Sequence, residues 1–380
     1  MTTPLNIVQT QIPTGMIDLG LGNPPLSLLP LDMIRLAAQE QLSKNDTSFL
    51  QYGTEQGDGY FRTALGNFLS KGYGFPVEPE RLFITTGISN GLDLLCSLFT
   101  KAGDTIFVEE PSYFLALKIF ADHQLQVVSV ETDDDGIILE ALKEKLAQHK
   151  PRLLYTIPTY QNPSGHTLTQ ERRARIVELS QQFDFLVLAD EVYQLLSYEG
   201  NPPKSFGVFA EAENVIALGS FSKILAPGLR MGWIQAHPNR ISRMSGSGLL
   251  DSGGGLNPFT SALLRGVIES GNLEKNIDNL IDVYRSRIQI MDEALREHLP
   301  EAKYALPQGG YFFWLRMPED VDGTELRKKA RAFNVDLRQG ALFSSRNALK
   351  NYIRLCFVFH EVDEIKEGIR RIKECLKSSD

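Results

Sequence analysis

The chain has 380 residues, and its 39 Lys and Arg against 47 Asp and Glu give a formal net charge of −8. At about 150 residues per domain, this length predicts two domains. A hydrophobic fraction of 42% with 23% charged residues is typical of a folded soluble protein, so disorder, collagen-like repeats and coiled coil are poor interpretations. The negative charge disfavours nucleic-acid binding, because Lys and Arg are needed to neutralise phosphates.

Cysteine usage and the start of the chain indicate a cytoplasmic protein. Cys96, Cys356 and Cys375 lie far apart without metal-ligand spacing, which predicts neither a disulfide scaffold nor a metal site. Residues 1–11 lack the charged and apolar segments of a secretory signal. No window approaches the roughly 20 apolar residues of a membrane-spanning helix.

Short apolar runs alternate with longer amphipathic runs from residue 80 onward. Strands are expected at 81–86, 105–108, 126–130, 153–157, 185–189, 215–218 and 232–236, and helices at 90–99, 112–123 and 170–182. This alternation predicts an α/β protein with a mainly parallel sheet covered by helices.

The pattern changes after residue 275. Helices through 281–288, at 325–333 and at 361–376, with strands at 310–315 and 352–357, predict a smaller α+β domain. We expect a large domain over 46–275 and a small domain that joins 1–45 with 276–380. A glycine-rich run at 246–255 is interpreted as a flexible surface loop or as a mobile segment over the entrance to a site.

The densest chemical signal is Ser220-Phe221-Ser222-Lys223, which Arg230 follows seven residues later. Hydroxyl and guanidinium donors in one turn suit an anion such as a phosphate. A desolvated lysine beside them can form a Schiff base with a carbonyl group. A solvated basic turn is the alternative.

Two polar groups follow predicted strands. Asp190 comes directly after the apolar run 185–189, and Tyr193 lies three residues further on. Ligands bind at the carboxyl ends of strands in open α/β sheets, although Asp at this place also caps helices. Asn162 precedes Pro163, which excludes the α conformation at Asn162, as it also would in a turn without a ligand.

Gly87 opens a strand-to-helix junction. Free backbone N–H groups at such a junction can bind an anion. The alternative is a simple helix N-cap by Ser89.

Gly87, Asn162, Asp190, Tyr193, Lys223 and Arg230 therefore fall at the ends of successive predicted strands. In this order and spacing the sequence resembles the pyridoxal-phosphate-dependent (PLP-dependent) aminotransferases of class I/II, with fold type I. The segments SFSK and LAPGLRMGW, at 220–223 and 225–233, are most similar to the branch of 2-aminoadipate and kynurenine aminotransferases. The resemblance covers nearly the whole chain.

The resemblance implies a role for each motif. Lys223 would hold the cofactor PLP through a Schiff base and move the substrate proton. Asp190 would pair with the pyridine nitrogen, and Tyr193 and Asn162 would hydrogen-bond the ring oxygen. The phosphate would be held by Ser220, Ser222, Arg230 and the backbone of Gly87, Ile88 and Ser89. Tyr113 would stack on the ring, although an amphipathic core aromatic is the alternative for it.

Substrate and partner contacts are implied in the same way. Arg354, in an apolar strand, would bind the substrate α-carboxylate as a bidentate guanidinium, and Gly22 would approach the substrate together with Asn162. Tyr52 resembles a tyrosine that reaches the phosphate of the partner subunit, which implies a homodimer. Gln339 stands where the family usually has proline, and no arginine between residues 1 and 32 offers a second anion-binding group.

We therefore expect an aminotransferase that moves an amino group from an α-amino acid to a 2-oxo acid. A PLP-dependent lyase or decarboxylase on the same scaffold is the alternative. A third hypothesis is a PLP-binding domain of a transcription regulator. It is disfavoured because the resemblance begins near Asp18, and because residues 1–80 carry four basic against eight acidic side chains, a net charge of 4 − 8 = −4.

Overall fold

The computed structural model describes residues 11–378, so residues 1–10 of the expected small domain lie outside its described part. Eight strands of these residues form one sheet in the order β2, β9, β8, β7, β6, β3, β4, β5. They are β2 (Leu82–Thr85), β3 (Thr105–Glu110), β4 (Gln126–Asp133), β5 (Gly136–Ile137), β6 (Pro151–Thr156), β7 (Leu186–Asp190), β8 (Val215–Ser220) and β9 (Gly232–Ala236). From β8 to β4 all neighbours are parallel, whereas β9 and β5 are antiparallel to theirs. The predicted α/β class with a mainly parallel sheet is confirmed.

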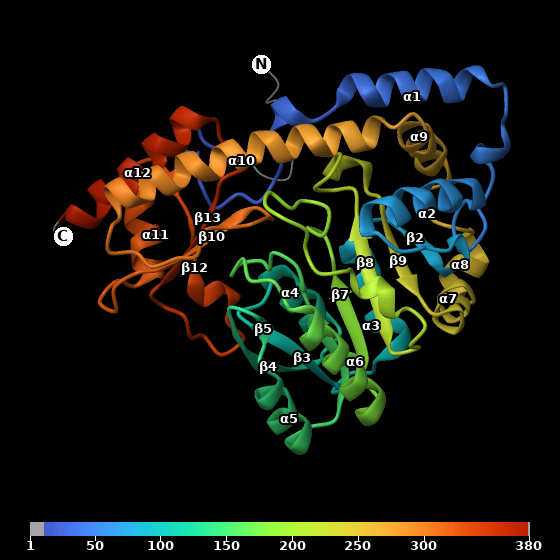
Figure 1. The fold of residues 1–380 in the computed structure, drawn as a ribbon, viewed down its shortest axis with the longest axis horizontal. Coiled ribbons are helices and arrows are strands. Elements are labelled where there is room, and N and C mark those ends of the chain that lie inside the picture. Colours follow the sequence, from blue (N-terminus) through green and yellow to red (C-terminus); the bar gives the residue numbers. More distant parts are fainter. Residues whose placement is uncertain (1–10, 379–380) are drawn as a thin grey trace, which may run out of the picture.

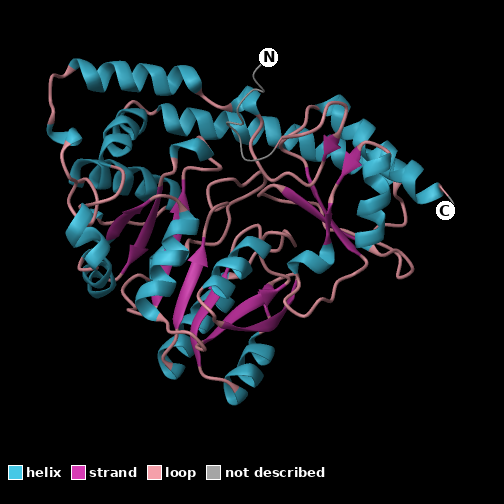
Figure 2. Ribbon diagram, turned by 180° about the vertical axis from the view of Figure 1, so that it is seen from behind, coloured by secondary structure: helices cyan, strands magenta, loops and turns pink. Residues whose placement is uncertain are grey.

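Helices cover both faces of the sheet, as the opposite views of Figures 1 and 2 show. They include α3 (Ile88–Phe99), α4 (Phe114–Asp122), α5 (Leu139–Gln148) and α6 (Gln170–Phe183). Phe120 of α4 and Leu188 of β7 belong to one apolar cluster. Ile176 of α6 and Val187 belong to another. Because successive side chains of a strand point to opposite faces, β7 is buried on both sides, and this explains its continuous apolar run.

A second, smaller sheet lies in the C-terminal part of the chain. Strand β13 (Tyr352–Cys356) pairs antiparallel with both β10 (Phe312–Arg316) and β12 (Arg338–Gln339). Beside it, β1 (Ile17–Asp18) pairs in parallel with β11 (Val335–Asp336). Helices α11 (Gly323–Ala332) and α12 (Val362–Lys377) complete this part. The expected strands and helices after residue 310 are therefore present.

The long helix α10 (Asn272–His298) connects the two parts of the molecule. It packs on α12 at one end and on α9 (Pro258–Glu269) at the other (Figure 1). Helix α1 (Leu31–Ser43) also packs on α9, away from the small sheet. Helix α2 (Gly59–Tyr73) packs on α9 as well. No helix within residues 11–378 is long and apolar enough to cross a membrane.

The glycine-rich run at 246–255 differs from its interpretation as a surface loop. It follows α7 (Pro238–Ser245) and contains a short helix, α8 (Gly248–Gly253). The backbone N–H of Gly255 donates to the carbonyl oxygen of Gly53 at 2.8 Å. A Cβ on Gly255 would overlap the carbonyl oxygen of Thr54. The glycine there allows two backbones to approach closely, a cause that the local sequence does not reveal.

Candidate active site

A cavity of about 350 Å³ lies where the carboxyl ends of β6, β7 and β8 meet the small sheet. Twelve of the residues proposed from the sequence line it: Gly22, Ile88, Ser89, Tyr113, Asn162, Asp190, Tyr193, Ser220, Ser222, Lys223, Arg230 and Arg354. Gly87 lies directly behind Arg230. Tyr52 does not line this cavity, and 83% of its surface is exposed. Residues up to 332 positions apart in the sequence (354 − 22) thus meet in one space.

Asp190 is the last residue of β7 and is 4% exposed. Its Oδ2 accepts a hydrogen bond of 2.8 Å from the hydroxyl of Tyr155, and its Oδ1 a longer one of 3.4 Å from the N–H of Val192. Burial raises the pKa of Asp190 to about 6. No helix begins at this residue, so the interpretation of Asp190 as a helix cap is wrong.

Lys223 follows β8 and reaches across the cavity. Its Nζ donates to the carbonyl oxygen of Gly22 at 2.6 Å and lies 5.2 Å from the ring centre of Tyr311. Burial lowers the pKa of Lys223 to about 8. Because Lys223 is half-buried and bonded in this way, the interpretation of 220–223 as a solvated turn is wrong.

The donors suited to an anion gather beside Lys223. The hydroxyl of Ser220 donates to Oγ of Ser222 at 2.9 Å. Arg230 has a positive φ of 47° and donates from Nη2 to the carbonyl oxygen of Thr86 at 3.0 Å. The first N–H groups of α3 have no acceptor within the helix, as at every helix start. Gly87, not Ser89, is the N-cap of α3, so the interpretation of Ser89 as the cap is wrong.

Gly87 allows the side chain of Arg230 to lie beside the start of α3. Its φ is 100°, a conformation that glycine adopts readily. A Cβ at Gly87 would lie 2.9 Å from Nη2 of Arg230. The missing side chain therefore leaves room for the guanidinium beside the start of α3.

Arg354 lies on β13 of the small sheet and is 3% exposed. It lines the same cavity as Lys223. It donates from Nη1 to Oδ1 of Asn162 at 2.8 Å and from Nη2 to the carbonyl oxygen of Gly20 at 2.7 Å. The guanidinium carbon lies 3.8 Å from the ring centre of Phe312. Its Nε is buried and bonds to no described residue. Burial lowers the pKa of Arg354 to about 10, at which it stays charged at neutral pH.

Aromatic residues complete the walls. Tyr193 packs against Tyr311 and Phe312, with ring centres 5.5 Å and 6.3 Å away. Tyr113 stands at the start of α4 and lines the cavity. Burial raises the pKa of both hydroxyls, to about 12 for Tyr113, so both tyrosines are neutral hydrogen-bonding groups at physiological pH.

The sequence did not single out several residues that support the site. Tyr155 donates to Asp190, and its place after Leu153 and Leu154 in β6 does not distinguish this tyrosine from a core residue. Fully buried Glu109 accepts from the hydroxyl of Thr156 at 2.8 Å and from the N–H of Ile157 at 3.0 Å. Gln161, next to Asn162, donates to the carbonyl oxygen of Pro111 at 2.7 Å. These contacts fix the segment that carries Asn162.

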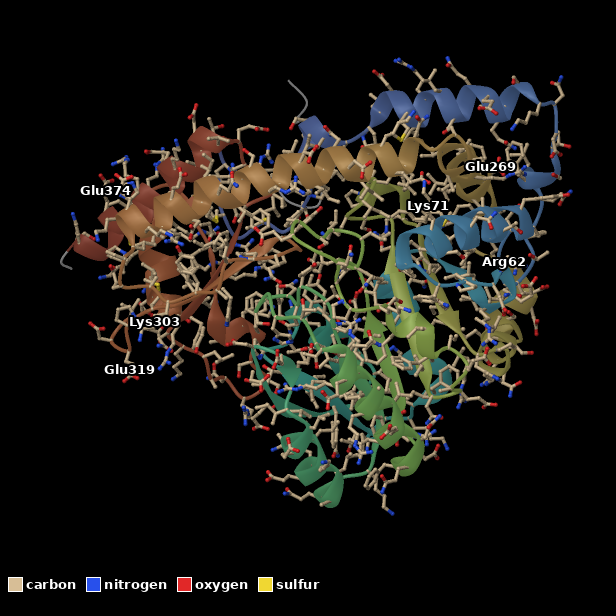
Figure 3. The ribbon with its side chains drawn as sticks, viewed as in Figure 1. Arg62, Lys71, Glu269, Lys303, Glu319 and Glu374 are labelled. Atoms are coloured by element: carbon tan, nitrogen blue, oxygen red, sulfur yellow. The ribbon has the colours of Figure 1, made fainter. Side chains whose placement is uncertain are left out.

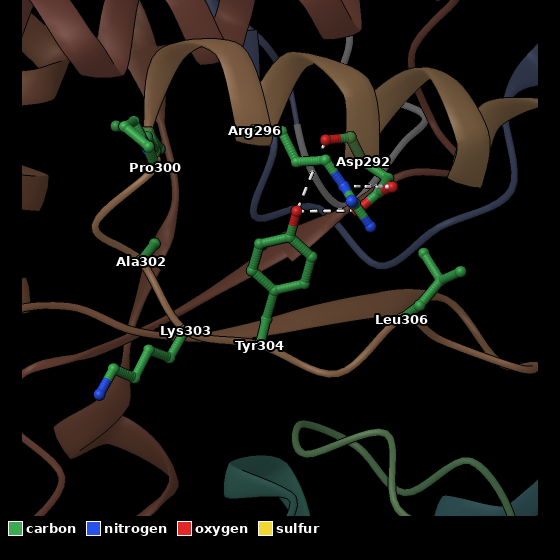
Figure 4. Close-up of a pocket in the computed structure, with 8 residues that line it drawn as sticks. Asp292, Arg296, Pro300, Ala302, Lys303, Tyr304 and Leu306 are labelled. Carbon is green, nitrogen blue, oxygen red and sulfur yellow. Dashed lines mark hydrogen bonds and ion pairs between the residues drawn. The ribbon is translucent and has the colours of Figure 1, made fainter.

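A second hollow lies between α10 and the segment before β10 (Figure 4). The hydroxyl of Tyr304 points at α10 and donates to Asp292 at 2.8 Å, and Arg296 bonds the same carboxylate. Lys303 points away from them (Figures 3 and 4). The polar groups of Asp292, Arg296 and Tyr304 thus bond one another, so we assign the hollow no role.

The fold and the cavity together define a PLP-dependent enzyme of fold type I. A family model described as aminotransferase class I and II matches residues 14–372, and the chain belongs to this family. Members of the family use PLP. The predicted family, activity class and cofactor are confirmed.

Individual relatives agree with the branch that the sequence resembles. The chain is 36% identical to aromatic-amino-acid aminotransferase 1 of Thermococcus litoralis, over 98% of this chain and 90% of that protein. It is 31% identical to the 2-aminoadipate transaminase of Thermus thermophilus, over 97% and 91%. The crystal structure of Pyrococcus horikoshii kynurenine aminotransferase in complex with PMP superposes with a TM-score of 0.90 at 35% identity, covering 96% and 91%.

Proposed function

We propose that this cavity transfers an amino group from an α-amino acid to a 2-oxo acid, with Lys223 as the residue that holds PLP. The observation that carries the proposal is the convergence of three groups in one cavity. These are the buried carboxylate of Asp190, the lysine with a lowered pKa and the anion site formed by Ser220, Ser222 and Arg230. Membership of the aminotransferase family supports it.

The cavity fits PLP. The hydroxyls of Ser220 and Ser222 and the guanidinium of Arg230 all line it, and these are donors that suit the oxygens of a phosphate. The residues that would hold the group are Ser220, Ser222, Arg230 and the backbone of Gly87, Ile88 and Ser89 for the phosphate, Asp190 for the pyridine nitrogen, Tyr193 and Asn162 for the ring oxygen, and Tyr113 for the ring face. Bound PLP supplies an electron sink for the electrons of the substrate Cα–H bond.

Lys223 would move the proton. Its Nζ must be neutral to accept the proton from the substrate Cα, and a pKa of about 8 leaves a usable neutral fraction near pH 7. Asp190 must stay ionised to pair with a protonated ring nitrogen. Its pKa of about 6 keeps it mainly ionised at neutral pH.

Arg354 would bind the α-carboxylate of the substrate. Its guanidinium is oriented by Asn162 and Gly20, and Nε has no protein acceptor within the described chain. Gly22 leaves the approach open, since a Cβ there would lie 2.8 Å from the Phe312 ring. A buried charge with a spare donor is well suited to a carboxylate.

The rest of the cavity supports amino donors with apolar side chains. Leu21, Phe114, Leu115 and Ile119 line it. This lining agrees with relatives named for aromatic amino acids and kynurenine. Apolar area removed from water would supply the binding energy of such side chains, at about 25 cal/mol per Å².

We also propose that the active form is a homodimer in which Tyr52 of one chain reaches the phosphate of the other. Tyr52 is 83% exposed. Large exposed leucines lie close to it in the sequence, namely Leu31, Leu36 and Leu42 on α1 and Leu50 after α1. Exposed apolar side chains on neighbouring segments favour a protein interface. Within one chain, Tyr52 has no place in the cavity.

The domain division is proposed as residues 46–275 for the cofactor and 1–45 with 276–380 for the small domain. Pairing of β1 with β11 supports this grouping, whereas the packing of α1 on α9 favours moving α1 to the large domain. A cytoplasmic location stays a prediction from cysteine usage.

The function is tested with a half-reaction screen. The PLP-loaded protein is mixed with single amino acids, and its conversion to the aminated cofactor is followed by absorbance. Lys223→Ala should abolish this conversion, while Lys303→Ala, an exposed lysine outside the cavity, should not change it. Turnover that releases ammonia without any 2-oxo acid would instead support the lyase alternative.

The dimer is tested by mixing two inactive variants. A hybrid of Lys223→Ala and Tyr52→Ala chains contains one site with both native residues only if Tyr52 acts across the interface. Recovered activity on mixing is expected. Absence of recovery, with hybrids verified by mass spectrometry, would contradict the shared site.

A further inference from the structure

Resting on the proposed function, we propose that Arg338 binds the second, distal carboxylate of a dicarboxylic amino acid or 2-oxo acid. Arg338 lies on β12 directly opposite Arg354 on β13. Residues paired across two antiparallel strands share one face of the sheet. Both arginines line the same cavity. The cavity therefore contains two guanidinium groups on the side of the small sheet.

A single glycine separates these two groups. Nη2 of Arg354 donates to the carbonyl oxygen of Gly20 at 2.7 Å. A Cβ on Gly20 would lie 2.5 Å from Nη1 of Arg338. Any larger residue at position 20 would displace Arg338. Two guanidinium groups in one cavity suit a ligand with two carboxylates, one on each arginine.

The charged groups around Arg338 leave it able to bind a further carboxylate. Asp336 is bound closely by Arg327, at 2.7 and 3.1 Å, and Arg331 lies 3.6 Å away. Asp18 already accepts from the N–H of Gly20 at 2.8 Å. Three guanidinium groups thus share two carboxylates, so the cluster carries 3 − 2 = +1.

The contacts of Arg338 with the two carboxylates are longer than those of Arg327. Arg338 reaches Asp18 at 3.3 Å from both Nη1 and Nη2 and Asp336 at 3.5 Å, and Nη1 also donates to the carbonyl oxygen of Leu337 at 3.2 Å. Its Nε makes no hydrogen bond to any residue in 11–378, and an arginine has five N–H donors. Asp18 and Asp336 therefore orient Arg338 without saturating it. A purely structural ion pair is the alternative, and it predicts no selectivity among ligands.

Binding of two unreactive acids of equal length tests the proposal. Glutarate has two carboxylates on five carbons, and valerate has one. Inhibition constants for both are measured on the PLP-loaded wild type and on Arg338→Gln, Arg338→Lys and Arg331→Gln. Arg331 belongs to the same cluster, but it is 59% exposed and does not line the cavity. It is therefore the matched control for charge.

The wild type should bind glutarate more tightly than valerate. Arg338→Gln should weaken glutarate binding about 10- to 100-fold, the worth of a hydrogen bond between charged groups, and leave valerate within about twofold. Arg338→Lys should retain part of the preference, because lysine keeps the charge but not the planar donor pair. Arg331→Gln should leave the ratio of the two constants unchanged.

An unchanged ratio in Arg338→Gln, or an equal loss in Arg331→Gln, would overturn the assignment. If Arg338→Gln does not fold, a wild type without preference for glutarate overturns it equally. The two failures are distinguishable: a protein that converts monocarboxylic amino acids but shows no glutarate preference refutes only this inference. A protein that converts no amino acid refutes the proposed function itself.

Discussion

The hydrogen bond between Tyr155 and Asp190 makes the sharpest prediction about the site. Tyr155 is fully buried on β6, and its hydroxyl donates to the carboxylate at 2.8 Å. Burial raises the pKa of Asp190, and the bond from Tyr155 is the largest opposing effect. Tyr155→Phe removes the hydroxyl and keeps the ring, which packs on Phe120 at 5.3 Å. We therefore expect the pKa of Asp190 to rise in this variant.

The size of the rise follows from the energy of the bond. A hydrogen bond to a charged group is worth about 1.5–3 kcal/mol, and a pKa shift of one corresponds to about 1.4 kcal/mol. The bond from the N–H of Val192, at 3.4 Å, is too long to compensate. The pKa of Asp190 should therefore rise from about 6 by about 1 to 2, to roughly 7–8. At pH 7 half or more of the carboxyl groups would then be protonated.

The pKa is measured in the PLP-free protein by carbon NMR of labelled aspartate, with Asp190→Asn to assign the resonance. The acid limb of the half-reaction rate should move to higher pH by the same amount. Tyr160→Phe is the control, since it loses an equal hydroxyl whose bond goes to Ser197 at 2.7 Å.

Two results would refute this reasoning. An unchanged or lowered pKa of Asp190 in Tyr155→Phe would mean that the hydroxyl does not stabilise the carboxylate. An equal rise of the pKa of Asp190 in Tyr160→Phe would mean that the effect comes from a general loosening of β6 and its surroundings.

Three further predictions concern the charged groups. Because folding raises the pKa of Asp190 from its ordinary value to about 6, PLP-free wild type should lose stability relative to Asp190→Asn as pH rises from about 4 to about 6, by up to about 3 kcal/mol in urea denaturation. The rate of PLP capture by the PLP-free protein should rise with pH through about 8 and then level off in stopped-flow traces, since only neutral Lys223 is nucleophilic. Arg354→Lys should lower kcat/KM for the amino donor about 10- to 100-fold, while Arg316→Lys on β10, whose side chain is 51% exposed, should leave it unchanged.

The elements that the sequence predicts well are those with local signals. Strand β9 has the predicted bounds of 232–236, with Pro238 closely following its end. Strand β7 ends at Asp190 because the apolar run stops there. The run at 246–255 is misleading, since its glycines serve a contact with residues near 53 that are distant in sequence.

The same distinction holds for the candidate site. Asp190 and Lys223 follow predicted strands, so their meeting in one cavity could be expected from the parallel order of the sheet. The role of Tyr155 could not be expected, because its partner lies on a neighbouring strand and the residues directly before Tyr155 are apolar. Arg338 could be read in the sequence only as part of a loop. Its pairing with Asp18 joins residues 320 positions apart, and only tertiary structure brings them together.

The charges of the cavity explain how one site could accept two kinds of substrate. Among its lining residues, Lys223, Arg230, Arg338 and Arg354 face the single carboxylate of Asp190, although the whole chain is acidic. On the proposed roles, the phosphate would neutralise Arg230 and the α-carboxylate Arg354. A bare Arg338 beside an apolar side chain would be costly, because an unpaired buried charge is strongly unfavourable.

The acidic partners of Arg338 remove that cost. With an apolar substrate, Asp18 and Asp336 remain its counter-ions at 3.3 and 3.5 Å. With a dicarboxylate, the substrate adds the negative charge that the cluster lacks. The long, shared contacts of Arg338 would thus allow the exchange between an apolar donor and a dicarboxylic acceptor, which a short and saturated ion pair would oppose.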